Sequence, residues 1–238
     1  MMLCINKTFK SDMIGIDEDL SNYDLVIAPV LYMVKGDYHK KLEKFVADGG
    51  TFVTTFFSGI VDEHDLVTTG GYPGKLRNLL GIWSEEIDAL HPDVYNQIVI
   101  KDKTTHLEGE YQCNILFDLI HSEGAEVVAE YGDDFYKGMP AVTRNTFGSG
   151  EAWYIASSPD SAFLQDLMAD LCAAKEIKPL LTSEPGVEVS QRVKEGQEYL
   201  FVMNHNNKTS QFELGNERAK TRPPYWRNRQ WHYINCRS

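Results

Sequence analysis

Residues 24–57 constrain the fold of this chain more than any other segment, because they predict two buried strands joined by a helix. Residues 25–29, LVIAP, form a short apolar run typical of a strand buried on both faces. After Asp37, apolar residues at helical spacing predict a helix that ends at Gly49 and Gly50. Residues 51–56, TFVTTF, are β-branched and aromatic, and predict a second strand. This order predicts a parallel strand pair and an α/β fold.

The following residues extend the same domain. They predict a long irregular loop over 58–74, a short helix near 75–80, and strands near 94–100, 126–131, 141–146 and 151–156. Ser158 and Pro159 begin a last helix with an apolar stripe, and Pro179 ends it. We therefore predict an α/β domain over residues 1–181, with a mostly parallel sheet flanked by helices.

A different pattern begins near residue 187. Residues 187–193 and 199–203 flank KEGQ, which predicts an antiparallel hairpin, and residues 211–214 predict a third strand. We expect a truncated β domain over 187–214. Residues 215–238 contain clustered arginines without clear periodicity, and are expected to form an irregular basic tail.

Composition excludes several classes of partner. The formal charge of -12 argues against phosphate neutralisation, and thus against nucleic-acid binding. No stretch approaches the roughly 20 apolar residues of a membrane helix, and the N-terminus lacks a signal-peptide pattern. The four cysteines include no CxxC pair, so we expect neither a disulfide framework nor a thiolate metal site. A cytoplasmic location is the expectation that fits these features best.

Four long segments resemble the family 42 glycoside hydrolases, which are β-galactosidases. They are YDLVIAPVLYMV from Tyr23, FVADGGTFVTTFFSGIVDEHDLV from Phe45, GGYPGKLRNLLGIWSEEIDAL from Gly70 and GMPAVTRNTFGSGEAWYIA from Gly138. The resemblance implies an α/β trimerisation domain similar to a class I glutamine amidotransferase, followed by the start of the family's small C-terminal β domain.

The same resemblance implies a function in assembly. Family members place a catalytic TIM barrel before these two parts, and the barrel supplies the paired glutamates that remove terminal β-galactosyl residues. This chain matches only the later parts. We therefore expect a non-catalytic, homotrimer-forming portion that is inactive alone, meets galactosides only through the missing barrel, and has no catalytic, cofactor-binding or metal-binding residues. A sugar-binding or regulatory module and an amidotransferase-like enzyme remain as alternatives.

Two local motifs test these alternatives. The segment TFFSG, which contains Ser58, stands where an amidotransferase-like elbow presents its nucleophile, but it carries no cysteine and no identifiable base. We interpret Ser58 as a turn residue. Residues 62–65, DEHD, contain good metal ligands, although four consecutive residues rarely converge on one ion. A solvated or subunit-contacting loop is the favoured interpretation.

Aromatic residues at predicted strand ends and in loops are the candidates for subunit contacts. Aromatic side chains in such positions often anchor interfaces. The candidates are Tyr32, Phe56, Phe57, Tyr72 and Trp83. Packing within the α/β core is the equally weighted alternative for each of them.

Overall fold

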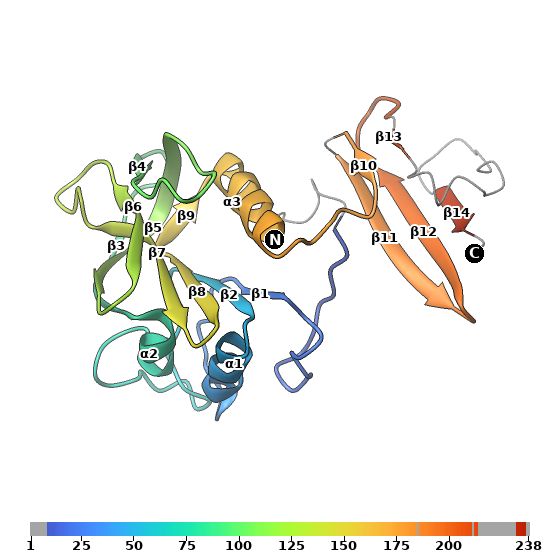
Figure 1. Cartoon of the computed structure of the whole chain (residues 1–238). Coiled ribbons are helices and arrows are strands. Elements are labelled where there is room, and N and C mark those ends of the chain that lie inside the picture. Colours follow the sequence, from blue (N-terminus) through green and yellow to red (C-terminus); the bar gives the residue numbers. More distant parts are fainter. Residues whose placement is uncertain (1–8, 185, 211, 214–231, 237–238) are drawn as a thin grey trace. The chain divides into compact units, whose positions relative to one another are not determined.

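A computed structural model describes residues 9–184, 186–210, 212–213 and 232–236. The chain divides into two compact units (Figure 1). One comprises Ile16–Leu171, and the other comprises residues 1–15 and 172–238. Among the helices of the described ranges, none has both the length and the apolar character needed to cross a bilayer.

The larger unit is built on a nine-stranded mixed sheet. The strand order is β1-β2-β8-β7-β6-β4-β5-β3, and β9 pairs with β5. The strands are β1 (Leu25–Ala28), β2 (Thr51–Thr55), β3 (Ile82–Ala89), β4 (Tyr95–Ile100), β5 (Glu110–Ser122), β6 (Glu126–Tyr131), β7 (Pro140–Phe147), β8 (Gly150–Ile155) and β9 (Ser157–Pro159).

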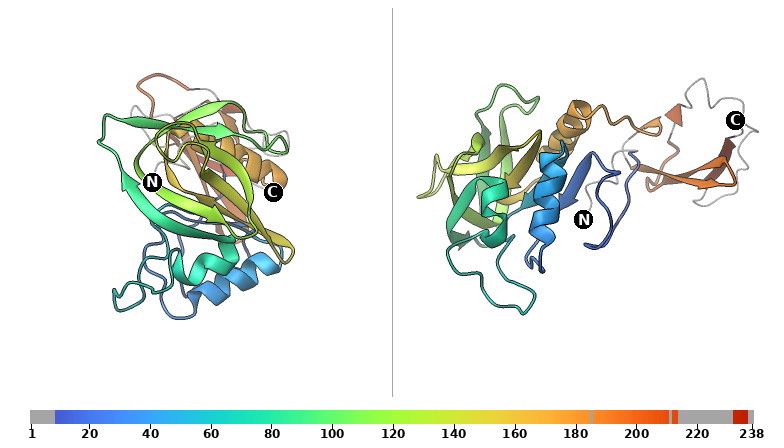
Figure 2. Two further views of the ribbon diagram at one scale, coloured as in Figure 1. Left: turned by 90° about the vertical axis from the view of Figure 1, so that its left-hand side faces the viewer. Right: turned by 60° about the horizontal axis from the view of Figure 1, so that its bottom comes forward.

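Helices cover the sheet on both sides. They are α1 (Tyr38–Ala47), the 3-10 helix η1 (Gly74–Leu76), α2 (Arg77–Leu80) and α3 (Ser161–Ala174). Helices α1 and α2 lie next to each other on one side of the sheet, and α3 lies on the other side (Figures 1 and 2). The α/β class predicted from the sequence is therefore confirmed.

The prediction of a mostly parallel sheet is wrong. Only the pairs β1–β2 and β2–β8 are parallel among the described strands, whereas the other pairs of this sheet are antiparallel. Strands β6, β7 and β8 follow one another as hairpins, and a hairpin connection makes neighbouring strands antiparallel. In addition, β3 and β5 were not predicted, and both extend the antiparallel part.

The predicted strand–helix–strand unit is present. Strands β1 and β2 are parallel, with Leu25 opposite Thr51 and Ala28 opposite Thr54. Helix α1 buries Leu42, Phe45 and Val46 along one face. A Cβ atom on Gly50 would lie 2.3 Å from the Phe45 ring, so only glycine lets the chain turn back this closely.

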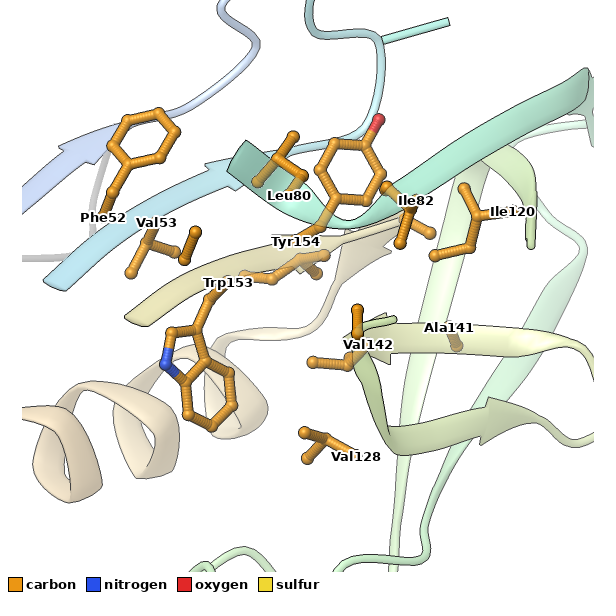
Figure 3. Packing of buried hydrophobic residues seen from close by; sticks show 14 of the residues in the cluster. Phe52, Val53, Leu80, Ile82, Ile120, Val128, Ala141, Val142, Trp153 and Tyr154 are labelled. Atoms are coloured by element: carbon orange, nitrogen blue, oxygen red, sulfur yellow. The ribbon is translucent and has the colours of Figure 1, made fainter. Parts of the chain in front are cut away.

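The core lies on both sides of the central strand β8. Trp153 and Tyr154 are adjacent in sequence and both are buried. Figure 3 shows their side chains pointing to opposite sides of the strand, Trp153 on the side of Val142 and Tyr154 on the side of Leu80 and Ile82. This double burial explains why residues 151–156 appear in the sequence as a nearly continuous apolar run.

The described residues of the smaller unit form five short or medium strands. They are β10 (Thr182–Ser183), β11 (Val187–Lys194), β12 (Gln197–Asn204), β13 (Phe212–Glu213) and β14 (His232–Cys236). Strands β11 and β12 form the predicted antiparallel hairpin, while β13 pairs with β10. Within the predicted irregular tail, residues 232–236 are described, and they form β14 against β12. The other residues of that tail lie outside the described ranges.

Candidate functional site

The loops that follow β1 and β2 meet at one edge of the sheet, because parallel strands end on the same side. The Gly59 N–H donates to the Leu31 carbonyl oxygen (2.9 Å), and the Ile60 N–H donates to the Tyr32 carbonyl oxygen (3.0 Å). Gly59 has a φ of 68°, and a Cβ atom on it would lie 2.0 Å from the Pro73 carbonyl oxygen. Ligands of open α/β sheets bind at this carboxyl edge.

Phe57 occupies a strained position in the elbow after β2. Its φ of 61° is in the left-handed region, which is uncommon for a bulky residue. The Phe57 N–H donates to Asp118 Oδ2 (3.0 Å), and the Phe57 ring stacks on Tyr32 with 5.3 Å between centroids and 24° between planes. The elbow therefore presents a fixed aromatic pair.

Asp118 is the buried carboxyl group that holds this elbow. It is 1% exposed, and Oδ2 also accepts a hydrogen bond from the Tyr154 hydroxyl. Within the described residues, Oδ1 has no hydrogen-bond partner. Burial raises the pKa of Asp118 to about 6, although the hydrogen bonds from Tyr154 and Phe57 act in the opposite direction. Asp118 was not predicted as a site residue; its signal in the sequence is an acidic residue inside the apolar run ILFDLI.

Val30 is a second bulky residue in the left-handed region. Its φ is 50° and its side chain is 41% exposed. The Val30 N–H donates to Thr55 Oγ1 (2.8 Å), and the next residue, Leu31, donates its N–H to Ser58 Oγ (2.9 Å). Side-chain hydroxyls from the end of β2 thus fix the backbone that carries Val30.

Ser58 stabilises the turn after β2 at this edge of the sheet. It is fully buried, and its Oγ donates to the Thr55 carbonyl oxygen (2.7 Å) and lies 2.8 Å from Thr54 Oγ1. Its hydroxyl is therefore engaged in holding the turn. The non-glycine residue in the left-handed region at this elbow is Phe57, which has no nucleophilic group.

Further apolar side chains are exposed on the loops of the same edge. Leu66 is 62% exposed and Val67 is 58% exposed. Val67 is bridged to Val61, whose N–H in turn donates to the Tyr32 carbonyl oxygen (3.2 Å). We call this surface the edge patch, defined by Val30, Tyr32, Phe57, Leu66 and Val67. Exposure of the aliphatic members depends on loop packing, so sequence reasoning did not find them.

The acidic loop beside the edge patch uses its carboxylates for its own structure. Asp62 Oδ1 accepts the N–H groups of His64 (2.8 Å) and Leu66 (3.1 Å), which lower the pKa of Asp62. Glu63 Oε2 accepts the Gly36 N–H (3.1 Å). No convergence of three or more metal-ligating side chains occurs in the part of the chain that the structure describes.

The predicted contact residues fall into separate places. All five are half-buried. Tyr32 and Phe57 are brought together, whereas Tyr72 lies beside β3 through a bond from the Ser84 N–H to its carbonyl oxygen (2.7 Å). Trp83 on β3 stacks on His121, with centroids 4.7 Å apart. Phe56 is fixed through its N–H to Ile155 and stacks on no ring among the described residues.

Comparison with known proteins identifies relatives for both units. Residues 4–178 match the family of the β-galactosidase trimerisation domain, and residues 186–221 match the β-galactosidase C-terminal domain. The chain is 65% identical over 203 residues to β-galactosidase BgaA of Planococcus sp. (strain 'SOS Orange'), and 44% identical over 207 residues to β-galactosidase Pbg of Clostridium perfringens. These alignments cover 85% and 86% of this chain, and 30% of each relative.

The fold is also similar to solved structures. The crystal structure of β-galactosidase from Bacillus circulans sp. alkalophilus matches with a TM-score of 0.91 and 50% identity, covering 99% of this chain and 36% of that one. A structure of Gan42B, a GH42 β-galactosidase from G. stearothermophilus, matches with a TM-score of 0.84 and 30% identity over 99% of this chain and 35% of that one. On these matches, the chain belongs to the family of GH42 β-galactosidase trimerisation domains, followed by the family's C-terminal domain.

Proposed function

We propose that this chain is the self-association portion of a β-galactosidase, and that its copies meet at the edge patch. The observation that carries this proposal is the backbone of Val30 and Phe57. Both residues are held in the left-handed region by buried polar groups, and both place apolar side chains at the surface. Such strain costs on the order of 1–3 kcal/mol per residue and concentrates at functional sites.

A homotrimer is the assembly that we infer, in agreement with the description of the matching family. Three identical copies in a closed ring use a heterologous contact, in which one surface of each copy meets a different surface of the next. The edge patch supplies one of these surfaces. A stable contact buries roughly 1,000 Å² or more in total, so neighbouring parts of the loops contribute to it.

The enzymatic activity of a longer protein that contains this chain is a separate part of the proposal. The chain spans about 30% of the length of relatives that are named β-galactosidases. We infer that a longer protein containing it removes terminal β-galactosyl groups by a retaining mechanism, which requires two carboxyl groups about 5 Å apart. The described residues present no such pair at the edge patch. We expect the 238-residue chain alone to leave a chromogenic β-galactoside uncleaved, and turnover would contradict this.

We also propose a fold relationship for the larger unit and a cellular location for the protein. We infer that β1, α1, β2 and β8 form an amidotransferase-like layer in which Phe57 stands where a nucleophile would be presented. Cys113 is buried and forms no disulfide among the described residues, which supports a reducing, cytoplasmic setting.

Measurement of mass in solution tests the contact. The chain has a mass of 27.1 kDa, and light scattering of the wild type is expected to give a value near three times this. Val67→Glu places a charge in the edge patch and is expected to shift the mass toward the monomer. Val193→Glu is the matched control, because Val193 is also exposed but lies in the smaller unit on β11. Equal masses for both variants would remove the edge patch from the interface.

A second pair of variants examines the aromatic residues outside the edge patch. Tyr72→Ala and Trp83→Ala truncate the two residues that lie on or beside β3. If Tyr72 and Trp83 belong to the second surface of a heterologous contact, each substitution should lower the mass measured at low protein concentration. An unchanged trimer would limit the aromatic contact candidates to Tyr32, Phe56 and Phe57.

A further inference from the structure

An open hollow of about 360 Å³ lies beside the β4–β5 ladder, and none of its lining residues belongs to the edge patch. This volume is within the range of small-molecule sites, roughly 300–1,000 Å³. The groups around it are two strands and the loop that follows β6. Its main lining residues are Tyr95, Asn96, Gln97, Gln112, Asp133 and Lys137.

The wall of the hollow is rigid. Asn96 is 2% exposed, its Nδ2 donates to the Asp133 carbonyl oxygen (3.0 Å), and its Oδ1 accepts the Asp133 N–H (2.9 Å) and the Gln97 N–H (2.7 Å). A Cβ atom on Gly132 would lie 2.8 Å from Gln97 Cβ, so glycine allows the loop to approach the strand this closely. The loop after β6 is thereby fixed to β4, and the hollow is formed before any ligand arrives.

Two glutamines supply hydrogen-bonding groups that the protein itself does not use. Gln97 and Gln112 are directly opposite each other in the antiparallel ladder, and both are exposed. Within the described ranges, the side-chain amides of Gln97 and Gln112 take part in no hydrogen bond with the protein. A primary amide both donates and accepts hydrogen bonds, as a sugar hydroxyl does. Asp133 and Lys137 carry opposite charges, which favours a ligand without net charge.

One exposed aromatic ring lines the hollow, and a second lies outside its lining in the loop after β6. Tyr95, at the start of β4, is 53% exposed. Phe135, in the loop after β6, is 73% exposed and is held edge-on against the buried Tyr136, with centroids 4.8 Å apart and planes at 83°. The face of an aromatic ring carries negative potential and attracts the polarised C–H groups on one face of a pyranose.

We infer that this hollow is a binding site for a neutral pyranose sugar, free or at the end of an oligosaccharide. The Tyr95 ring stacks on one face of the sugar, and the amides of Gln97 and Gln112 bond its hydroxyls. The site lies on this chain and is separate from the self-association proposed above. It would hold a saccharide without cleaving it, because the hollow contains one carboxylate, that of Asp133.

Titration of the full chain with galactose and lactose, followed by calorimetry or by NMR, tests the inference. Saturable binding in the millimolar range is expected for the wild type. Galactitol, an acyclic polyol with no ring face, is expected to bind at least about tenfold more weakly than galactose. Tyr95→Ala and the double variant Gln97→Ala/Gln112→Ala should each weaken sugar binding about tenfold or more.

Asn78→Ala is the matched control, because it also deletes an exposed carboxamide in the same unit but lies on α2. It should bind as the wild type does. Circular dichroism checks that each variant is folded, and if Tyr95→Ala unfolds, the double glutamine variant decides. The inference is overturned if the wild type shows no saturable binding of either sugar, or if binding survives both sets of changes at full strength.

Discussion

The parallel and antiparallel halves of the main sheet present their functional groups in different ways. In the parallel half, β2 is buried at each of its five residues. In the antiparallel half, β4 alternates, with Tyr95 and Gln97 exposed and Asn96 and Ile98 buried. Parallel strands covered on both faces can offer only their ends to a partner, whereas antiparallel strands can keep one face free. The edge patch therefore lies at strand ends, and the hollow lies on a strand face.

Matched aromatic truncations should produce the largest difference between the halves. Phe52→Ala in β2 removes a fully buried ring and should lower the free energy of unfolding by roughly 3–5 kcal/mol. Tyr95→Ala in β4 removes a half-exposed ring and should cost about 1 kcal/mol or less. Urea denaturation of both variants measures these costs. Similar costs would mean that the two strands are not buried differently.

Asp118 couples the halves, because it lies on β5 and binds the elbow after β2. Its pKa is about 6 in the folded chain against an ordinary value of 3.8, so between these values the folded state keeps a proton that the unfolded state has lost. Its contribution to the free energy of unfolding therefore falls as the pH rises from 4 to 6. The total change is about 3 kcal/mol.

The neutral variant Asp118→Asn isolates this effect, because other titrating groups are common to both proteins. The free energy of unfolding of the variant minus that of the wild type should increase by about 2 kcal/mol between pH 4 and pH 7. Chemical denaturation at a series of pH values gives this difference. If the free energies of unfolding of the two proteins stay a constant distance apart across this pH range, the Asp118 carboxyl group does not titrate there.

Two glycines allow a smaller test of how tightly the loops of each half are packed. Gly59→Ala places a Cβ against the Pro73 carbonyl oxygen, while Gly138→Ala, in the antiparallel half, meets no atom within 4 Å. Both have positive φ, at 68° and 85°, so both variants carry backbone strain. The steric clash should make Gly59→Ala less stable than Gly138→Ala by about 2 kcal/mol. Thermal unfolding of the pair decides this.

The smallest expected effect is a gain in stability within β5. Ile115 is 48% exposed and has a φ of 74°, so Ile115→Gly should relieve strain and raise the free energy of unfolding by about 1 kcal/mol. Thr146→Gly in β7 is the control, since Thr146 is exposed and β-branched but has no positive φ. It should lower stability by roughly 0.5–1 kcal/mol. Loss of stability in both would remove strain as the explanation for Ile115.

The elements missed by sequence reasoning have irregular pairing. The ladder between β3 and β5 shifts register between Ser84 and Glu86, and β5 pairs with β4 up to Asn114 but with β3 from Leu116 onward. Such shifts interrupt the alternation on which strand prediction depends. Because β3 and β5 were not predicted, the remaining predicted strands were interpreted as a mostly parallel sheet. The regular apolar runs of β1, β2 and β8 were found because both of their faces are buried.

The sequence by itself determined the strand–helix–strand unit, the C-terminal hairpin and the family, because these depend on local periodicity and on long matching segments. Only the tertiary structure decided that most of the sheet is antiparallel, that Asp118 reaches the Phe57 elbow, and that Val30, Leu66 and Val67 are exposed on the loops of the edge that carries the Tyr32–Phe57 pair. These features join residues up to 61 positions apart. Their energies arise from burial and from contacts that exist only once the chain has folded, so local patterns do not record them.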